Sequence, residues 1–343
     1  MRIPIFWDPV QLLHDPPNEL SEGMLVSYAE QPIRARRILD ALSDWDFGWI
    51  EAPGPLDEAL LQRVHSADYL ALLRAAWADW LAEGRSGAAM AGCWPVRGRA
   101  DVAPSRVQAR LGAACFDAGT PITAQTLPAA EAAAAIGQAT GAAVAMGAQL
   151  AFGLCRPPGH HAGRDYMGGY CYLNNAALAA ERLLAGGLQR VAVLDVDYHH
   201  GNGTQDIFYA RGDVFFASLH CDPQTDFPYF WGRADEKGAG AGQGANLNLP
   251  LPRGTNWAGY APALQAALAA ITSFEAQALV LSFGADTFEA DPISHFRLKT
   301  GDYRLMGAAI AELGLPMAVI MEGGYCIEAL GLNVRHFLEG LAG

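Results

Sequence analysis

Basic residues are scarce in this chain of 343 residues, which has 23 Lys and Arg against 36 Asp and Glu. Lysine itself occurs only at Lys237 and Lys299. The formal net charge of −13 repels the phosphates of nucleic acid and the anionic surface of a membrane, so we expect neither as a partner. A cationic or neutral small molecule is easier to reconcile with this charge balance.

Cysteine pairs and secretory signals are also lacking. The six cysteines stand far apart, without a C-x-x-C pair or a dense framework. In a chain of this length, that spacing excludes a disulfide-stapled scaffold and favours reduced thiols in the cytoplasm. The opening residues MRIPIFWD reach an acid before any apolar segment of secretory length, so we expect no signal peptide.

No linker-like stretch, internal repeat or heptad run divides the chain. Hydrophobic residues make up 51% and charged residues 17%, which allows one large buried core, and we expect a single domain over residues 1–343. The uncharged run from Ala132 to Cys155 is rich in alanine and is broken by polar residues and glycines. It therefore predicts a buried helix lying close to a sheet, not a membrane span.

From about residue 150, short apolar runs alternate with amphipathic, alanine-rich segments. This alternation is typical of βα units and predicts an α/β fold with a central, mostly parallel sheet flanked by helices. The predicted strands are Leu150 to Cys155, Val191 to Val196, Val214 to Leu219, Leu279 to Phe283 and Met317 to Met321. The predicted helices are Asn175 to Leu184, Ala258 to Phe274, Asp302 to Leu313 and Ile327 to Leu341.

A polar loop follows each predicted strand, and most of these loops contain glycine. In chain order they include RPPGHH, DYHHGNG, HCDP, GADT and EGGY. The carboxyl ends of parallel strands meet at one edge of a sheet, where open α/β folds place their sites. We therefore expect the functional site at that edge.

The loop after the second of these strands suggests a metal site. Asp195, Asp197 and His199 alternate along the chain, so their side chains share one face as the strand ends. Burying three such groups is costly unless a metal ion partners them, and Asp197 and His199 fit as ligands. Asp286, which follows the strand at 279–283, is the obvious third ligand, although any one of these residues alone would be read as a helix cap.

Two further features suit acid and base chemistry. His160 and His161 are adjacent after a rigid Pro-Pro-Gly turn, and histidine exchanges protons near neutral pH. Tyr325 follows two glycines after the last predicted strand, and a phenol beside a metal can donate a hydrogen bond to a developing oxyanion. Alone, these residues would be surface histidines and a packing tyrosine, but beside a candidate metal group they favour a functional site.

These residues resemble the histone deacetylase and acetylpolyamine amidohydrolase superfamily of zinc amidohydrolases, which has the arginase-like α/β fold. The resemblance covers nearly the whole chain and is closest to the bacterial acetylpolyamine amidohydrolases. The stretches that carry it are RPPGHHAGRDYMGGYCYLNN (156–175), VLDVDYHHGNGTQD (193–206), FASLH (216–220), SFGADTFEADP (282–292) and MEGGY (321–325), with weaker matches at 30–34 and 64–69.

The resemblance implies a zinc-dependent deacetylase that acts on linear amides. Asp197, His199 and Asp286 would hold one Zn²⁺ per subunit, although this ligand set can also hold Fe²⁺ or Co²⁺. His161 would be the general base, and Tyr325 would bind the substrate carbonyl oxygen.

Three neighbouring residues would support these roles. His160 would give electrostatic support, while Asp195 and Asn202 would fix the rings of His160 and His161 respectively. Because Asn202 is neutral where some relatives have a carboxylate, we expect His161 to be less basic here than in those relatives.

Further residues resemble the substrate tunnel and the monovalent-cation sites of the family. Tyr170 and Phe227, together with Gly169, resemble a narrow tunnel that suits a slender acylated chain. The residues that match the first K⁺ site are Asp195, Asp197, His199, Ser218 and Leu219, and those that match part of the second are Phe208, Arg211 and Val214. K⁺ would have a structural role.

Charge placement favours a small cationic substrate such as an acetylpolyamine. Residues 3–33 contain five acids and no Lys or Arg: Asp8, Asp15, Glu19, Glu22 and Glu30. Against strict polyamine specificity, residues 105–110 read SRVQAR where polyamine-type relatives tend to carry acids, and only Asp117 follows shortly after. Acetyl-lysine peptides and other small amides therefore stay open as alternatives.

The segment at about 77–126 is rich in Arg, Gly and Pro, has weak periodicity and contains Trp77, Trp80 and Trp94. We expect an irregular insertion, and its position matches a dimer-forming insertion of the compact bacterial relatives. A homodimer would close the tunnel to folded proteins. The alternative is a surface excursion that packs on its own domain.

Other functional classes fit less well. A binuclear ureohydrolase needs extra carboxylates where this chain has Gly201 and Phe288, and no G-x-S-x-G element indicates a serine hydrolase. Acidic, polar sequence precedes the glycine-rich stretch 238–244, where a nucleotide-binding loop would follow a strand. A binding module without turnover would be expected to lack a ligand, a histidine or the tyrosine, and this chain keeps all of them.

Overall fold

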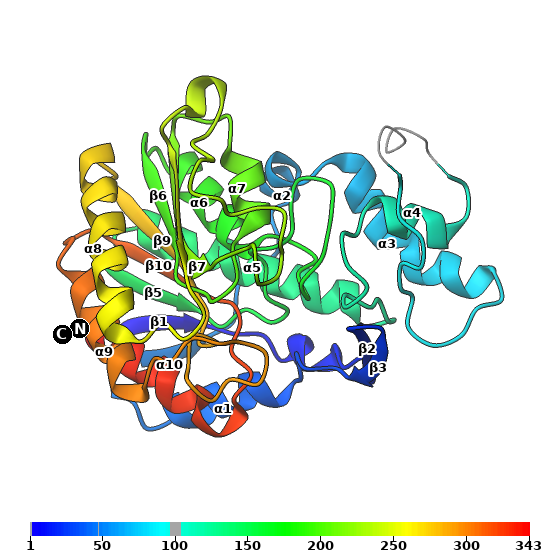
Figure 1. Cartoon of the computed structure of the whole chain (residues 1–343), viewed down its shortest axis with the longest axis horizontal. Helices are drawn as coiled ribbons and strands as arrows, with labels where there is room; N and C mark the ends of the chain where they lie inside the picture. The colour runs from blue at the N-terminus through cyan, green and yellow to red at the C-terminus, as the bar shows by residue number, and fades with distance from the viewer. Residues whose placement is uncertain (1, 47, 97–103) are drawn as a thin grey trace.

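The core of the structure is an eight-stranded sheet in which all neighbouring strands run parallel (Figure 1). The computed structural model describes residues 2–46, 48–96 and 104–343. The strands are β1 (Ile3–Phe6), β4 (Gly48–Glu51), β5 (Leu150–Gly153), β6 (Val191–Asp195), β7 (Val214–Cys221), β8 (Asn246–Leu251), β9 (Ala278–Phe283) and β10 (Met317–Met321). Their spatial order is β4-β1-β5-β10-β9-β6-β7-β8, so the predicted parallel sheet is confirmed.

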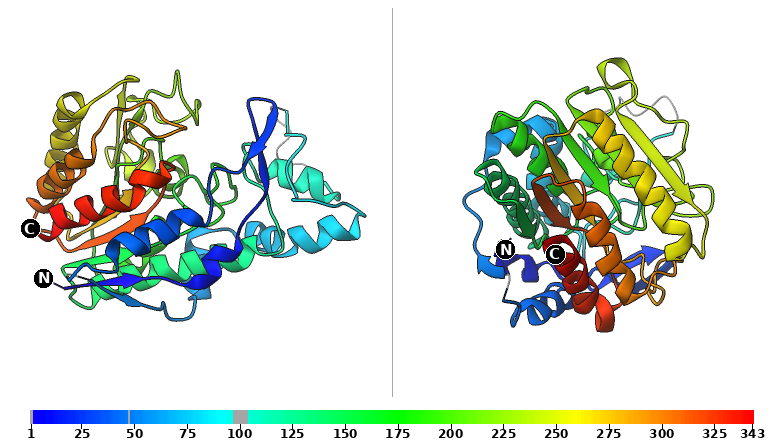
Figure 2. Two further views of the ribbon diagram at one scale, coloured as in Figure 1. Left: turned by 90° about the horizontal axis from the view of Figure 1, so that it is seen from below. Right: turned by 90° about the vertical axis from the view of Figure 1, so that its left-hand side faces the viewer.

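Helices cover both faces of this sheet (Figure 2). One face carries α2 (Glu58–Val64), α5 (Thr126–Ala145), α6 (Asn175–Ala185) and α7 (Asn202–Phe208). The other carries α1 (Ile33–Leu42), α8 (Trp257–Phe274), α9 (Thr300–Ala311) and α10 (Ile327–Ala342). Short 3-10 turns occur at Pro9–Leu13 and Gly240–Gly242.

The period of two along a buried strand explains this layering. On β10, Ala318 and Ile320 join the core under α5 and α6, whereas Met317, Val319 and Met321 join the core under α8 to α10. All of β10 is buried, because a parallel sheet with helices on both faces leaves neither side to solvent. Such strands read as continuous apolar runs, and this is why the sequence predicted them.

The helix α5 occupies most of the long uncharged run. It lies close to the sheet, as expected, because a Cβ at Gly153 on β5 would lie 2.5 Å from Thr140 Oγ1. Its glycines also allow a close approach to the helix α6. A Cβ at Gly141 would lie 2.6 Å from the carbonyl oxygen of Ala179 on α6. Within the described ranges, no helix combines the length and the apolar character needed to cross a membrane.

Two excursions lie beyond the carboxyl ends of the strands, at the same end of the molecule in both figures. One is the antiparallel hairpin of β2 (Asn18–Ser21) and β3 (Met24–Ser27). The other contains α3 (Ala67–Ala82) and α4 (Val107–Ala113). The expectation of an irregular segment from residue 77 is wrong at its start, because Trp77 and Trp80 lie on α3, where Trp80 packs in the core. Residues 97–103 of this insertion lie outside the described residues.

Candidate active site

The polar side chains singled out in the sequence meet at the carboxyl edge of the sheet. Asp195 ends β6, and the loop after it brings Asp197 and His199 toward Asp286, which follows β9. The histidine pair follows β5, and Tyr325 follows β10, the strand between β5 and β9. Four loops therefore supply one site, although their residues are far apart in the sequence.

Asp197, His199 and Asp286 form a group suited to a metal ion. One ligand atom from each lies within 4.8 Å of the other two. His199 Nδ1 is 3.4 Å from Asp197 Oδ1 and 3.0 Å from Asp286 Oδ2. Gly323 leaves this space open, because a Cβ there would lie 2.6 Å from Asp286 Oδ2 and 2.7 Å from Asp197 Oδ2. The donor set and the space beside it fit a divalent cation.

The electrostatics of this group also favour a cation. Burial raises the pKa of Asp286 to about 7, and repulsion from Asp197 adds to the effect. Burial alone would lower the pKa of His199, but hydrogen bonds and attraction to Asp197 and Asp286 raise it to about 10. Positive charge is therefore strongly favoured between the two carboxylates.

His160 is held by the carboxylate of Asp195, as the sequence predicted. His160 Nδ1 lies 2.9 Å from Asp195 Oδ2, and both side chains are buried. Burial opposes a charge on this ring, but Asp197 and Asp195 together raise the pKa of His160 to about 10. These two carboxylates therefore favour the protonated form of the ring.

His161 has a neutral partner instead. Its Nδ1 lies 2.7 Å from Asn202 Oδ1, and the Asn202 amide nitrogen is 3.4 Å from the hydroxyl of Tyr166. This orientation of the amide requires the hydrogen of His161 on Nδ1 and leaves the lone pair on Nε2. Burial lowers the pKa of His161 well below its usual value, and repulsion from His160 and His199 adds to the effect.

Tyr325 is anchored through its own backbone. Its N–H donates to Asp291 Oδ2 at 2.7 Å, from the loop that also carries Asp286. Burial raises the pKa of Tyr325 well above its usual value, so the phenol keeps its proton. Its ring centre lies 5.8 Å from that of Tyr170.

The residues assigned to the substrate tunnel adjoin these catalytic candidates. Phe227 has its ring centre 5.2 Å from that of His161 and 6.0 Å from that of His199. Gly169 has a positive φ of 54°, and a Cβ there would collide with the His161 ring. Gly169 and Tyr170 therefore pass directly beside His161 and Tyr325.

Both excursions beyond the sheet reach this wall of the site. Asp117, from the insertion, accepts the Gly169 N–H through Oδ2. Glu19, from the β2–β3 hairpin, accepts the Tyr170 hydroxyl at 3.1 Å. Burial raises the pKa of Glu19 to about 7, although the hydrogen bond from Tyr170 opposes this rise.

Two basic residues of the insertion, Arg106 and Arg110, are paired with acids within it. Arg106 lies 3.1 Å from Glu83, and Arg110 forms an ion pair with Asp79. Of the other amino-terminal acids, Glu30 is fully buried between Arg34 and Arg156. Glu19 is thus the amino-terminal acid that adjoins the predicted tunnel wall.

The residues matched to K⁺ sites lie along β6, β7 and the end of α7. Asp195 pairs with Ser218 in the sheet register, which places Leu219 one residue further along β7. Phe208 ends α7 and Val214 begins β7, with Arg211 between them. The Arg211 side chain pairs with Asp213 and Glu181.

A second group of side chains of the kinds that bind metals includes one member of the histidine pair. His160, Cys171 and Glu322 are all buried, with ligand atoms within 4.8 Å of one another. However, His160 Nδ1 faces Asp195, Cys171 Sγ donates to Gly169 O, and Glu322 accepts several hydrogen bonds. Each of these three side chains already has a hydrogen-bond partner outside the group, so we assign no metal ion to it.

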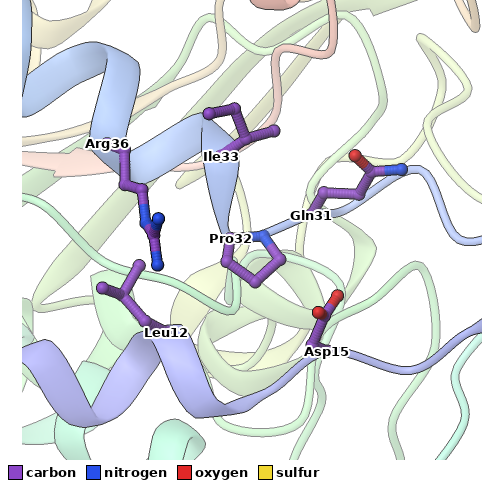
Figure 3. A pocket seen from close by; sticks show the side chains of 6 residues that line it. All are labelled: Leu12, Asp15, Gln31, Pro32, Ile33 and Arg36. Carbon is purple, nitrogen blue, oxygen red and sulfur yellow. The ribbon is translucent and has the colours of Figure 1, made fainter.

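A surface pocket of about 280 Å³ lies between the turn at Pro9–Leu13 and the start of α1 (Figure 3). Leu12 and Arg36 lie on one side of it, and Asp15 and Gln31 on the other. It shares no residue with the histidine and carboxylate site.

Sequence reasoning missed several residues that shape the site. Arg34 and Glu322 stood inside stretches that matched the family, but nothing in their spacing pointed to a role. Phe116, from the insertion, stacks on Phe227 with ring centres 5.5 Å apart. Only its place next to Asp117 would have drawn attention to it.

A parallel sheet whose carboxyl edge carries this histidine pair and carboxylate group is the arrangement expected of a histone deacetylase domain, and the model of that domain family matches residues 28–341. The chain belongs to the histone deacetylase family. Among its relatives, acetylpolyamine amidohydrolase 2 of Pseudomonas aeruginosa is 49% identical over 331 residues, covering 96% of each chain. The acetylpolyamine amidohydrolase of Mycoplana ramosa is 48% identical over 331 residues, covering 96% of this chain and 97% of the relative.

A solved structure shows the same fold. The acetylpolyamine aminohydrolase from Burkholderia pseudomallei superposes with a TM-score of 0.95 at 40% identity, covering 99% of each chain. The predicted arginase-like deacetylase fold is therefore confirmed.

Proposed function

We propose that this protein hydrolyses the amide of a small N-acetylated amine, with acetylpolyamines as the substrate class. One observation carries the proposal. The candidate metal ligands, the histidine pair and Tyr325 lie together at the sheet edge, next to a wall that contains the buried acid Glu19. The similarity to acetylpolyamine amidohydrolases over 96% of the chain supports the same conclusion.

Asp197, His199 and Asp286 would hold the metal ion, for which we propose Zn²⁺. Such an ion supplies Lewis-acid polarisation of the amide carbonyl and makes water more acidic. The same two carboxylates and imidazole also suit Fe²⁺ or Co²⁺.

His161 acts as the general base in this proposal. The hydrogen bond from Nδ1 to Asn202 leaves the Nε2 lone pair free to take a proton from the attacking water. His161 then delivers that proton to the leaving nitrogen. His160, held by Asp195, would support the negative charge that develops on the substrate.

Tyr325 donates a hydrogen bond from its phenolic hydroxyl to the oxygen of the tetrahedral intermediate. Its backbone contact with Asp291 and its neighbour Tyr170 hold it in place. Tyr170, Gly169 and Phe227 would line a narrow path to the metal group, in which a slender chain excludes water.

Glu19 supports a cationic substrate. Its carboxylate meets the hydroxyl of Tyr170, so it lies beside the predicted path. The neighbouring Asp117 is a second acid on the same wall. The ion pairs of Arg106 and Arg110 weaken the earlier objection to a polyamine, because each of these two arginines already contacts an acid of the insertion.

Three further properties belong to this proposal. Structural K⁺ would bind backbone carbonyls around Asp195 and Ser218, which lie side by side in the sheet. A homodimer through the insertion is supported by exposed apolar side chains there, such as Val96 at 72% exposed. A reducing, cytoplasmic location is supported by the six free cysteines.

The test is a steady-state comparison of N-acetylputrescine, N-acetylcadaverine, acetylspermidine, an acetyl-lysine peptide and neutral alkyl amides, with metal content measured. Preference for the acetylated amines is the expected result, and rapid deacetylation of an intact histone would contradict it. Tyr325→Phe and His161→Ala should lose turnover while keeping the metal. Retained activity in both variants would reject the assigned roles.

A further inference from the structure

Glu322 is a buried carboxylate to which neither the proposed mechanism nor the metal group assigns a role. It follows β10 directly and is fully buried. Its Oε2 accepts the backbone N–H of Gly159 at 2.6 Å and that of His160 at 3.1 Å. Its Oε1 accepts the hydroxyl of Ser282, on β9, at 3.2 Å.

These contacts connect three neighbouring parts of the sheet edge. The strand β10 lies between β5 and β9, and Glu322 reaches the loop after β5 on one side and β9 on the other. The loop after β5 carries the histidine pair. Two buried N–H groups of this loop would lack an acceptor without Glu322, which is unfavourable for buried donors.

The residues that follow Glu322 contact a candidate metal ligand and include the candidate catalytic tyrosine. The N–H of Gly323 donates to Asp197 Oδ2 at 2.9 Å, and Tyr325 supplies the phenol. Arg34 donates to the carbonyl oxygens of Glu322 and Gly324, at 2.6 Å in each case. One short segment therefore fixes the tyrosine, a candidate metal ligand and, through the Glu322 side chain, the backbone of the histidine pair.

We infer that Glu322 is a positioning residue, whose side-chain reach sets the distance between the His160–His161 backbone and the segment that carries Tyr325. This inference rests on the proposed amide hydrolysis for its kinetic consequence. The length of the side chain matters, and not its charge, because the N–H groups of Gly159 and His160 both need an acceptor oxygen where Glu322 Oε2 lies. An aspartate is shorter by one carbon–carbon bond of about 1.5 Å, so it keeps the charge and loses the contact.

Two variants separate reach from charge. Glu322→Gln keeps the length and an acceptor oxygen but removes the charge, whereas Glu322→Asp keeps the charge and loses the length. We expect Glu322→Gln to retain most of the wild-type kcat, and Glu322→Asp to lose kcat by about 100-fold with little change in KM, as a misplacement of about 1 Å can cause. Both variants should keep the metal, because Asp197, His199 and Asp286 are unchanged.

Hydrogen exchange of the peptide 156–163 gives a readout that is independent of turnover. The amides of Gly159 and His160 should stay protected in wild type and Glu322→Gln, and should exchange faster in Glu322→Asp. If Glu322→Asp does not fold, Glu322→Gln alone decides: retained kcat and protection support the inference, and loss of either overturns it.

The reverse ranking of the two variants, or wild-type exchange in a folded Glu322→Asp, would also overturn it. An inactive wild type would reject only the proposed function, because the exchange comparison would still test the position of the loop.

Discussion

The guanidinium carbon of Arg34 lies 4.8 Å from the ring centre of Tyr325. Arg34 is buried and is held at Nη1 by Glu30 at 2.6 Å, while its other nitrogens bind backbone carbonyls on both sides of Gly323. A residue on the first helix of the chain thus supports the tyrosine that follows the last strand. Arg34 thus combines an ion pair with Glu30 and a cation–π contact with Tyr325.

Arg34→Leu should therefore cost stability and activity together. It leaves two buried carbonyls and part of Glu30 without a donor, and we expect a loss of about 3 kcal/mol in the free energy of unfolding. Urea denaturation measures this loss, and kcat should fall because Tyr325 loses its support. Arg190→Leu is the matched control, because Arg190 pairs with Glu275 on the surface and should cost less than about 1 kcal/mol. Equal losses in both variants would contradict the prediction.

Asn202→Asp should move the acid limb of the kcat/KM profile to higher pH. A carboxylate at this position would lie against His161 Nδ1, where the neutral amide now sits at 2.7 Å, and would favour the protonated ring. The base must be neutral to act, so more alkaline conditions would be needed. Asn202→Ser, which places no charge there, is the control. An unmoved acid limb in Asn202→Asp would sink this prediction.

His65 should make the protein less stable as the pH falls below 6.5. Its Nδ1–H donates to Gly163 O at 2.8 Å, and its Nε2 accepts the Asn174 N–H at 3.0 Å, which requires a neutral ring. Burial lowers the pKa of His65 to about 4, although its backbone hydrogen bonds act in the opposite direction. Between pH 6.5 and 4 the unfolded chain binds a proton that the folded protein does not, so stability decreases with falling pH.

The expected contribution of His65 is about 2 kcal/mol between pH 7 and pH 5. Urea denaturation at both values measures it. His65→Gln should be less stable at pH 7 and should show a smaller loss on acidification than the wild type. His295→Gln, at an exposed site, is the control variant. The same acid-induced loss in His65→Gln and wild type would count against this assignment.

Gly141→Ala should destabilise the contact of α5 with α6. The added Cβ would lie 2.6 Å from Ala179 O and 3.0 Å from Ala179 Cα, so one helix must move away from the other. We expect a loss of about 1–3 kcal/mol, measured by thermal or urea unfolding. Gly301→Ala has no atom within 4 Å of the new Cβ and lies in α9, so it should be neutral or stabilising by up to about 1 kcal/mol. A neutral Gly141→Ala would show that the helices adjust freely.

Glu19→Gln should raise KM for cationic acetylated amines and leave KM for neutral alkyl amides unchanged. Because burial raises the pKa of Glu19 to about 7, its charge is fully present only above neutral pH. The effect should thus be largest near pH 8.5, with about a tenfold increase that corresponds to ~1.4 kcal/mol. Glu22→Gln, in the turn of the same hairpin, is the control. The same KM change for both substrate types would remove Glu19 from amine recognition.

The central strands could be predicted because they are continuous apolar runs. The strand β10 has the predicted bounds, Met317–Met321, between a proline and the buried Glu322. The strand β1 was missed, because it has only four residues and includes a proline. Its place in the sheet depends on pairing with β5, and local sequence contains no information about that partner.

In the site, too, local motifs could be predicted and contacts between distant residues could not. The pairs His160–Asp195 and His161–Asn202 could be anticipated, since both follow from the two motifs at the sheet edge. The contact of Glu322 with Gly159 joins residues 163 positions apart, and that of Arg34 with Gly324 joins residues 290 apart. Such contacts exist only once the sheet has assembled, so the spacing of residues did not reveal them.

The hairpin with Glu19 and the insertion with Phe116 and Asp117 both stand outside the sheet that carries the histidines. On the proposed function, recognition and chemistry would reside in different parts of the chain. A change of length or charge in either excursion would then alter which amines reach the histidines. Such an arrangement would give natural variation, or a protein engineer, a way to change the substrate without rebuilding the catalytic centre.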